Sequence, residues 1–256
     1  MKFRIMAIIL ALGIIVPIAA TTSEAYIPSE TTNTSLSYIE TNNKYELEQQ
    51  INECKTIMVH AHDMANAGRG LGYEENHKVV LLAKEEWETA NNLYNQYQNK
   101  YNKILAIENE KWKQKEKEYP VASAIWKYLK SLGYNDYVCA GIMGNIMAEV
   151  GGQTLNINPY ARNKSYYGMC QWSKGYSGVW GADLNGQCEF LAKSIRYELN
   201  TYGYAYQKGF NYEKFISLTN EKQAALAFCK CYERCGPGSY KARQKNATTA
   251  LNYFTK

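Results

Sequence analysis

One apolar segment, Tyr137–Gly152, constrains the fold of this chain more than any other. Its apolar side chains recur at helical spacing, and its single carboxylate belongs to Glu149, near the end of the segment. Gly141 and Gly144 leave room for the close approach of a neighbouring backbone, and the glycine pair after the glutamate ends the helix. The segment therefore predicts an apolar helix around which the rest of a domain is organised.

Glu149 lies in the last turn of this predicted helix, next to backbone carbonyls that have no intrahelical partner. The helix dipole opposes a negative charge at that end, and apolar neighbours add a desolvation penalty to the ionised form. Both effects favour the protonated carboxyl that a general acid needs near neutral pH. The alternative is that Glu149 turns outward and is merely solvated.

Two further motifs follow in a set order. Tyr166–Trp172 reads Tyr-Tyr-Gly-Met-Cys-Gln-Trp, and Tyr232–Arg234 reads Tyr-Glu-Arg. With Ala140–Glu149 and the apolar pair of Gln187–Leu191, they make residues 119–254 resemble the phage tail lysozyme family. That family belongs to the lysozyme-like superfamily, together with goose-type lysozymes and lytic transglycosylases.

The resemblance implies a lysozyme-like α+β domain with a small β-hairpin, and Glu149 as the general acid. The bond cut would be the β-1,4 link from N-acetylmuramic acid to N-acetylglucosamine in peptidoglycan. The resemblance also implies that Gln171 holds a sugar or the loop beside the glutamate, and that Tyr232 hydrogen-bonds Glu149. The chain departs from many relatives at Val150, where they carry a serine, so a helper hydroxyl is missing.

A second carboxylate usually assists glycoside hydrolysis. Asp183, Glu189 and Glu233 are the candidates, although Glu233 can equally form a structural ion pair with its neighbouring arginine. Relatives in the superfamily often use one glutamate, either with a loosely positioned water or with attack by the substrate itself, which yields an anhydro sugar. The sequence therefore leaves muramidase and lytic transglycosylase chemistry open.

Aromatic side chains crowd the segment after Glu149. Aromatic faces stack on sugar rings, so we favour a sugar-binding groove; the alternative is core packing, above all for Trp172. The aromatic side chains are those of Tyr160, Tyr166, Tyr167, Trp172, Tyr176 and Trp180. The predicted substrate contacts are Tyr166, Tyr167, Gln171, Trp172, Tyr232 and Glu233.

The beginning of the chain predicts export. A short basic segment, Met1–Arg4, precedes the apolar run Ile5–Ala20, which predicts a secretory signal peptide over residues 1–25. An uncleaved membrane anchor is less favoured, because a spanning helix needs about 20 apolar residues. Residues 26–43 are rich in Thr, Ser and Asn and predict a flexible linker, so we expect a secreted or wall-associated protein.

Residues 44–118 predict a helical hairpin or coiled coil, with Gly68–Gly72 as its turn. Apolar residues step by three and four on both sides of that turn. We expect this region to act as a spacer, a docking element or a site of self-association. The predicted seam is Leu47, Ile51, Cys54, Met58, Ala61 and Ala65, then Val80, Ala83, Trp87, Ala90, Tyr94, Tyr97, Tyr101 and Ile104.

All three histidines lie in this region, at positions 60, 62 and 77, with Asp63 nearby. A metal site is conceivable, but residues two apart on a helix point away from each other, so a solvated helix surface is the favoured interpretation. We expect no metal and no cofactor. The absence of histidine after His77 also excludes an internal Cys/His peptidase pair in the C-terminal domain.

Charge separates the two halves of the chain. Residues 1–118 hold 13 Lys and Arg against 16 Asp and Glu, whereas residues 119–256 hold 16 against 8. A basic surface favours an anionic polymer, and peptidoglycan with its teichoic acids fits an exported protein. Nucleic acid is not expected, because no nucleic-acid motif accompanies the charge. A wall-binding scaffold without turnover remains the rival from another functional class.

Seven cysteines suggest an oxidising compartment. Six of them lie in residues 119–256 and allow 15 pairings, including a Cys139–Cys170 bridge near the glutamate. The alternative is that several of the six are reduced core residues. Cys54 is the odd one, on the seam of the predicted hairpin.

Overall fold

The computed structural model describes residues 38–256 except Ser177. The chain divides into two compact units between Ile107 and Glu108. The predicted signal peptide and most of the predicted linker lie outside the described residues. Within the described part, no helix is both long and apolar enough to cross a membrane.

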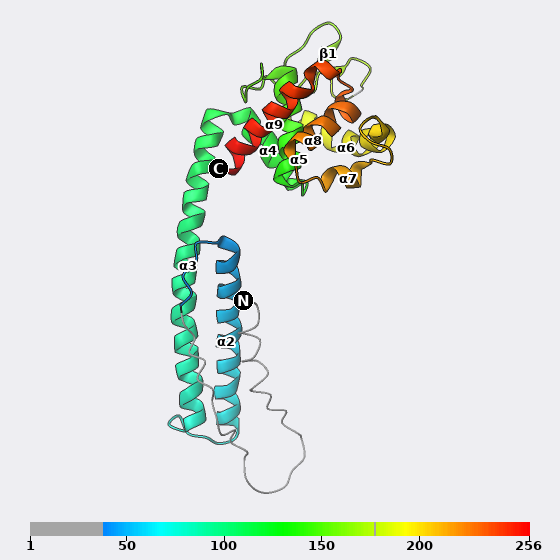
Figure 1. Ribbon diagram of the computed structural model, residues 1–256. Helices are drawn as coiled ribbons and strands as arrows, with labels where there is room; N and C mark the ends of the chain where they lie inside the picture. Colours follow the sequence, from blue (N-terminus) through cyan, green and yellow to red (C-terminus); the bar gives the residue numbers. More distant parts are fainter. Residues whose placement is uncertain (1–37, 177) are drawn as a thin grey trace. The chain divides into compact units, whose positions relative to one another are not determined.

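The first unit contains two antiparallel helices, α2 (Lys44–Gly70) and the first part of α3 (Lys78–Glu118), joined by a short turn (Figure 1). At one end of the pair, the hydroxyl of Tyr97 accepts a hydrogen bond from the backbone of Ile39 at 2.8 Å. At the other, Gly68 packs against the side chain of Val80. The apolar cluster between the helices comprises Leu47, Ile51, Cys54, Leu93 and Tyr97.

The seam between α2 and α3 largely follows the predicted spacing. Two residues differ: Trp87 is 41% exposed, whereas Leu93, which the prediction left out, is buried. Small side chains make up the seam near Trp87, and its indole lies at the edge. The predicted seam positions found buried are Leu47, Ile51, Cys54, Ala61, Ala65, Val80, Ala83, Ala90 and Tyr97.

The second unit is mostly α-helical with one small β-hairpin, as predicted. Strands β1 (Tyr166–Tyr167) and β2 (Trp172–Ser173) are antiparallel, and Tyr167 lies opposite Trp172. The α-helices are α4 (Pro120–Ser131), α5 (Asp136–Val150), α6 (Leu184–Tyr202), α7 (Tyr212–Ile216), α8 (Glu221–Phe228) and α9 (Tyr240–Thr255). The short helical segments are the 3-10 helices η1 (Gly203–Ala205) and η3 (Pro237–Ser239) and the π-helix η2 (Cys229–Glu233).

Helix α5 is the centre of this unit, with α8 and α9 packed against it (Figure 1). Asn135 caps its start, because its side chain accepts from the backbone N–H of Val138 at 3.0 Å. Asp136 is the first helical residue and pairs with Lys130 at 2.7 Å. Every residue of α5 from Val138 to Met147 is buried.

Two glycines of α5 allow this close packing, as predicted. A Cβ atom at Gly141 would lie 2.5 Å from the Cβ of Ala224 in α8. A Cβ atom at Gly144 would lie 2.6 Å from the backbone nitrogen of Ala247 in α9. Because both helices touch α5 at its backbone, they also bring residues of their own to its carboxyl end.

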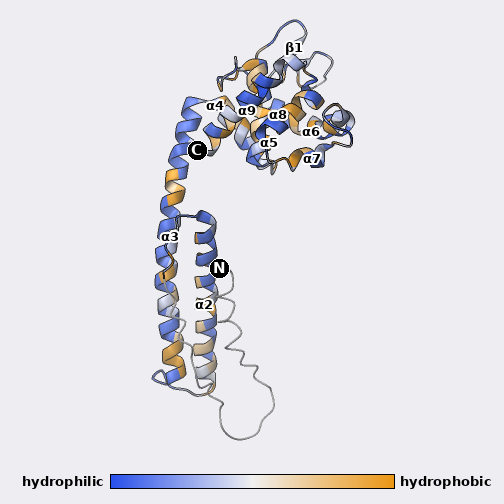
Figure 2. Ribbon diagram, viewed as in Figure 1, coloured by the Kyte–Doolittle hydropathy of each residue, from blue (hydrophilic) through white to orange (hydrophobic). Residues whose placement is uncertain are grey.

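The last part of α3 belongs to the second unit. This stretch, Lys111–Glu118, is hydrophilic (Figure 2). Its tryptophan, Trp112, nevertheless stacks on Phe254 of α9, with the ring centroids 5.9 Å apart. The hydroxyl of Tyr253 also donates to Glu118 at 3.0 Å. The end of α3 is therefore fixed to α9.

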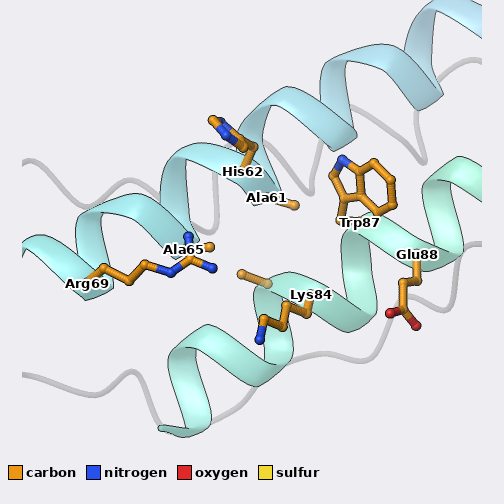
Figure 3. Close-up of a pocket in the computed structure, with 8 residues that line it drawn as sticks. Ala61, His62, Ala65, Arg69, Lys84, Trp87 and Glu88 are labelled. Atoms are coloured by element: carbon orange, nitrogen blue, oxygen red, sulfur yellow. The ribbon is translucent and has the colours of Figure 1, made fainter. Parts of the chain in front are cut away.

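A surface pocket lies between α2 and α3 in the first unit (Figure 3). Its floor consists of small side chains, and Trp87 flanks it. Arg69 and Lys84 at its rim both pair with Glu75. Its lining residues are Ala61, His62, Ala65, Arg69, Ala83, Lys84, Trp87 and Glu88, none of which belongs to the predicted site.

Candidate active site

Glu149 lies in the last turn of α5, where the predicted helix placed it, and its side chain is 21% exposed. A guanidinium nitrogen of Arg243, from α9, donates a hydrogen bond to its carboxylate. The Arg243 side chain is only 7% exposed, so the ion pair is largely shielded from solvent. Glu149 is therefore neither fully buried nor turned freely outward, because one oxygen is held from inside the domain.

Asn145, one helical turn before Glu149, fixes the same arginine. Its side-chain oxygen accepts from Arg243 at 3.0 Å, while its amide nitrogen donates to the carbonyls of Gly141 at 2.8 Å and Ala225 at 3.0 Å. Asn145 is fully buried, so all of these bonds replace contacts with water. The guanidinium is thereby oriented by α5 as well as paired with it.

The sequence predicted that Glu149 lies at a helix end among apolar neighbours. The structure adds a guanidinium from another helix that pairs with its carboxyl group. The charges beside Glu149 therefore come from Arg243 as well as from the end of α5.

Glu233, the last residue of η2, is the second carboxyl close to this pair. Burial, together with the negative charge of Glu149, raises the pKa of Glu233 to about 8. The guanidinium of Arg243 and the thiol of Cys170 lower that pKa without cancelling the rise. Its Oε1 atom is buried and has no hydrogen-bond partner within the described residues. Glu233 is therefore mainly protonated at neutral pH.

Glu233 does not form the ion pair with Arg234 that the sequence left open. Arg234 has a left-handed backbone, with φ of 54°, and its side chain contacts other groups. It lies 3.4 Å from the buried carboxylate of Glu198 and donates to the hydroxyl of Tyr176 at 2.7 Å. The structural ion pair of this motif is thus Arg234 with Glu198.

The other two candidate carboxylates have different surroundings. Asp183 caps α6, because its side chain accepts from the backbone N–H of Gly186 at 2.8 Å. Glu189 is half exposed and accepts a hydrogen bond from Asn185 at 2.9 Å. Glu233 is the candidate that burial and the charge of Glu149 affect directly, since both raise its pKa.

The hydroxyl of Tyr232 has different hydrogen-bond partners from the one expected. Its hydroxyl accepts a hydrogen bond from the indole of Trp172 at 2.9 Å and lies 2.7 Å from the hydroxyl of Ser194. The predicted bond to Glu149 is wrong, since Tyr232 is buried and its hydroxyl serves this internal network. The network ties η2 to the β-hairpin and to α6, so it holds the segment that carries Glu233.

The predicted sugar contacts divide into two sets. Tyr167 and Trp172 are buried, which matches the core-packing alternative for these aromatics. Gln171 has a left-handed backbone and donates to the carbonyl of Gly168 at 2.9 Å, so it shapes the tip of the hairpin. Tyr166 is 47% exposed and is available to solvent. Their roles in substrate binding remain predictions.

The cysteines form one disulfide within the described residues, between Cys229 and Cys235. It closes a short loop around η2, with the two Cα atoms 5.5 Å apart. The Cys139–Cys170 bridge that the sequence left open is absent, since both residues are free and buried. The core alternative therefore holds for four of the six, Cys139, Cys170, Cys188 and Cys231, which are free and buried. Cys54, on the seam between α2 and α3, is also a free, buried thiol.

Arg243 is the site residue that sequence reasoning missed. A signal was present: Arg243, Ala247, Ala250 and Phe254 step by four, three and four, so the arginine lies on the apolar face of α9. An arginine on a buried face needs an acidic or strongly polar partner.

No group of three His, Cys, Asp or Glu side chains in residues 38–256, Ser177 apart, could hold a metal ion.

A mostly helical domain with a small β-hairpin, with one glutamate in the last turn of its central helix and a second in η2, has the features of a lysozyme-like glycosidase. The model of the phage tail lysozyme family matches residues 120–254, more than half of the chain. The chain belongs to the phage tail lysozyme family, and its second unit is therefore a lysozyme-like, peptidoglycan-cleaving domain. Comparisons with curated proteins and with solved structures found no match.

Proposed function

We propose that the protein is a secreted enzyme that cleaves the β-1,4 bond between N-acetylmuramic acid and N-acetylglucosamine, with Glu149 as general acid. The observation that carries this proposal is the position of Glu149. Its carboxyl is partly exposed at the end of a buried helix, and a buried arginine fixes it from the inner side. A general acid needs this combination of access to substrate and fixed orientation.

In the proposed reaction, Glu149 gives its proton to the glycosidic oxygen as the bond to the sugar carbon breaks. The electron pair of that bond stays on the leaving oxygen, while a water molecule bonds to the sugar carbon and gives up a proton to solvent. Arg243 stabilises the carboxylate that Glu149 becomes, because the two groups already form an ion pair. Asn145 keeps the guanidinium in place through its own hydrogen bond.

Exposed aromatic side chains in the second unit support a carbohydrate substrate. Tyr160 is 56% exposed, Tyr166 is 47% exposed and Trp180 is 37% exposed. All three come from the segment between α5 and α6. Because aromatic rings and the apolar faces of sugars stack on each other, these residues are the proposed glycan contacts.

The remainder of the chain fits delivery to a cell wall. We propose that residues 1–25 direct export, that residues 26–43 are a linker and that the helical region over 44–118 holds residues 119–256 away from its attachment. The net excess of about eight positive charges over residues 119–256 supports binding to anionic wall polymers.

The test is release of soluble fragments from purified peptidoglycan by the full chain. Glu149→Gln keeps the size of the side chain but cannot donate a carboxyl proton, so we expect release to fall to the background rate. Glu189→Gln is the matched control, since this half-exposed glutamate is outside the proposed site. A wild-type chain that binds the wall but releases nothing would support the scaffold instead.

A further inference from the structure

The turn that ends α5, Gly151–Thr154, holds a glutamine in a strained backbone conformation. Gln153 has φ of 69°, and Gly152 before it has φ of 55°. A glycine adopts such left-handed angles at no steric cost, whereas a glutamine in this conformation is uncommon. Strained residues of this kind gather at functional sites, where the surrounding structure holds them in place. The side chain at position 153 is therefore kept at some cost to stability.

Hydrogen bonds anchor both the backbone and the side chain of Gln153. Its backbone N–H donates to the carbonyl of Met147 in α5 at 3.1 Å. Its side-chain oxygen accepts from the amide of Asn246 in α9 at 2.7 Å. Asn246 is only 3% exposed, and its amide nitrogen also donates to the carbonyl of Gly144 at 3.3 Å. Gln153 is itself exposed, so a buried polar group fixes a side chain at the surface.

These contacts determine which end of the Gln153 amide faces solvent. The carbonyl of Gly144 can only accept, so the group of Asn246 that faces it is the amide nitrogen. The same nitrogen faces Gln153, which must therefore present its oxygen to α9. The contact with α9 leaves the two N–H groups of the Gln153 amide on the exposed side, and these groups can only donate. The surface thus carries an oriented hydrogen-bond donor.

Helix α9 holds this donor and Glu149 at the same end of α5. Arg243 bonds the carboxylate of Glu149. Asn246, which bonds Gln153, follows Arg243 by three residues, an advance of about 4.5 Å along a helix. Both α9 side chains are buried and both contact α5, so they lie on one face of α9. The separation of these two anchors along α9 is comparable to the length of one sugar ring.

We propose that Gln153 is a specificity-determining residue that donates a hydrogen bond to the acetamido carbonyl of a peptidoglycan sugar bound at Glu149. This inference rests on the proposed function of Glu149. An acetamido carbonyl accepts hydrogen bonds and carries no charge, so it matches a neutral donor such as the glutamine amide. The strained turn and Asn246 hold that donor in one orientation before substrate binds, which lowers the entropy cost of the contact.

The proposal predicts that the enzyme distinguishes acetylated from deacetylated glycans. Removal of the acetyl group leaves an amine on the sugar, which is protonated in mildly acidic solution. An ammonium group only donates, so it forms no hydrogen bond with the N–H groups of Gln153. A glutamine that served only to hold α5 against α9 would affect the cleavage of both substrates equally.

The test compares kcat/KM of the full chain on N-acetylated peptidoglycan and on the same material after de-N-acetylation, in mildly acidic solution. Both substrates keep their stem peptides, so peptide carbonyls do not alter the ratio of the two values. In Gln153→Glu the new carboxylate still accepts from Asn246 but presents an acceptor, instead of donors, to the sugar. We expect its ratio of acetylated to deacetylated cleavage to fall about tenfold or more below that of the wild type.

Two further variants complete the test. Gln207→Glu adds the same charge at an exposed position of the second unit and should keep the wild-type ratio. Gln153→Asn suits the left-handed backbone better than glutamine does, so it should fold, but its shorter amide should lose most of the preference for acetylated glycan.

Equal ratios in Gln153→Glu and Gln207→Glu would overturn the proposal, even if Gln153→Glu cleaved both substrates more slowly than the wild type. A wild type that cleaves neither substrate would remove the proposed function of Glu149, and this inference with it. The two failures are distinguishable, because the first leaves the wild type active.

Discussion

Arg243 of α9 donates a hydrogen bond to the carboxylate of Glu149 at the end of α5, across 94 residues of sequence. This contact joins the two helices at the glutamate on which the proposed reaction depends. Arg243 also binds Asn145 at 3.0 Å, so one buried side chain fixes two polar groups of α5. Both the stability of the domain and the geometry of its acid should therefore depend on this arginine.

Replacing Arg243 by Gln should destabilise the second unit by about 3–5 kcal/mol, because it leaves a partly buried carboxylate without its partner. Arg196→Gln is the control, since Arg196 pairs with Glu213 in solvent, where both side chains are more than 60% exposed. That control should cost about 1 kcal/mol or less. Denaturant unfolding measures both values, and equal losses would count against a structural role for Arg243.

The stability of the chain should fall as pH rises from about 4.5 to about 8. Glu233 binds its proton at higher pH in the folded chain than in the unfolded chain, where its pKa is near 4.5. Between these pH values the folded chain holds more protons, so raising the pH favours unfolding. Denaturant unfolding at several pH values in this range measures how the free energy of unfolding changes with pH. This change should be smaller for Glu233→Gln than for Glu189→Gln. Equal changes in the two variants would show that Glu233 titrates normally.

Gly141→Ala should destabilise the second unit by about 1–3 kcal/mol, because the added methyl group overlaps Ala224 of α8. Gly238→Ala is the matched control, since no atom beyond its two chain neighbours lies within 4 Å of the position its Cβ would take. Thermal unfolding compares the two variants. Equal melting temperatures would mean that α8 can move away from α5 at little cost.

Tyr232→Phe should cost about 1–3 kcal/mol of stability, because the buried indole N–H of Trp172 loses its acceptor. The position of the activity profile along the pH axis should stay unchanged, since the hydroxyl does not contact Glu149. Tyr160→Phe, on a side chain that is 56% exposed, is the control and should alter stability little. If the pH profile of activity shifted along the pH axis in Tyr232→Phe, Tyr232 would act directly on Glu149, contrary to this account.

The central helix could be predicted because its signals are local. The apolar spacing of Tyr137–Gly152, its closely packed glycines and its glutamate all lie within one segment. The pairing of Glu149 with Arg243 could not be assigned, since it depends on how α9 returns to α5. The family resemblance also assigned Tyr232 to the wrong partner, because its hydroxyl bonds to groups from the β-hairpin and α6.

The pairing of α2 with α3 also shows which contacts the sequence spacing could not predict. Spacing alone placed Tyr97 and Leu47 correctly in the seam. It could not decide between Leu93 and Tyr94, which are adjacent on the helix, because the choice depends on the rotation of α3 against α2. It also placed Trp87 inside, where the neighbouring Ala61 and Ala83 form a seam of small side chains.

The most direct test of the account is mass spectrometry of the fragments that the full chain releases from purified peptidoglycan. The account predicts glycan fragments that end in reducing N-acetylmuramic acid and that disappear with Glu149→Gln. Anhydromuramic ends with the same dependence on Glu149 would keep the bond and the acid but change the reaction to lytic transglycosylation. Intact glycan with released peptides, or fragments that persist in Glu149→Gln, would contradict the account.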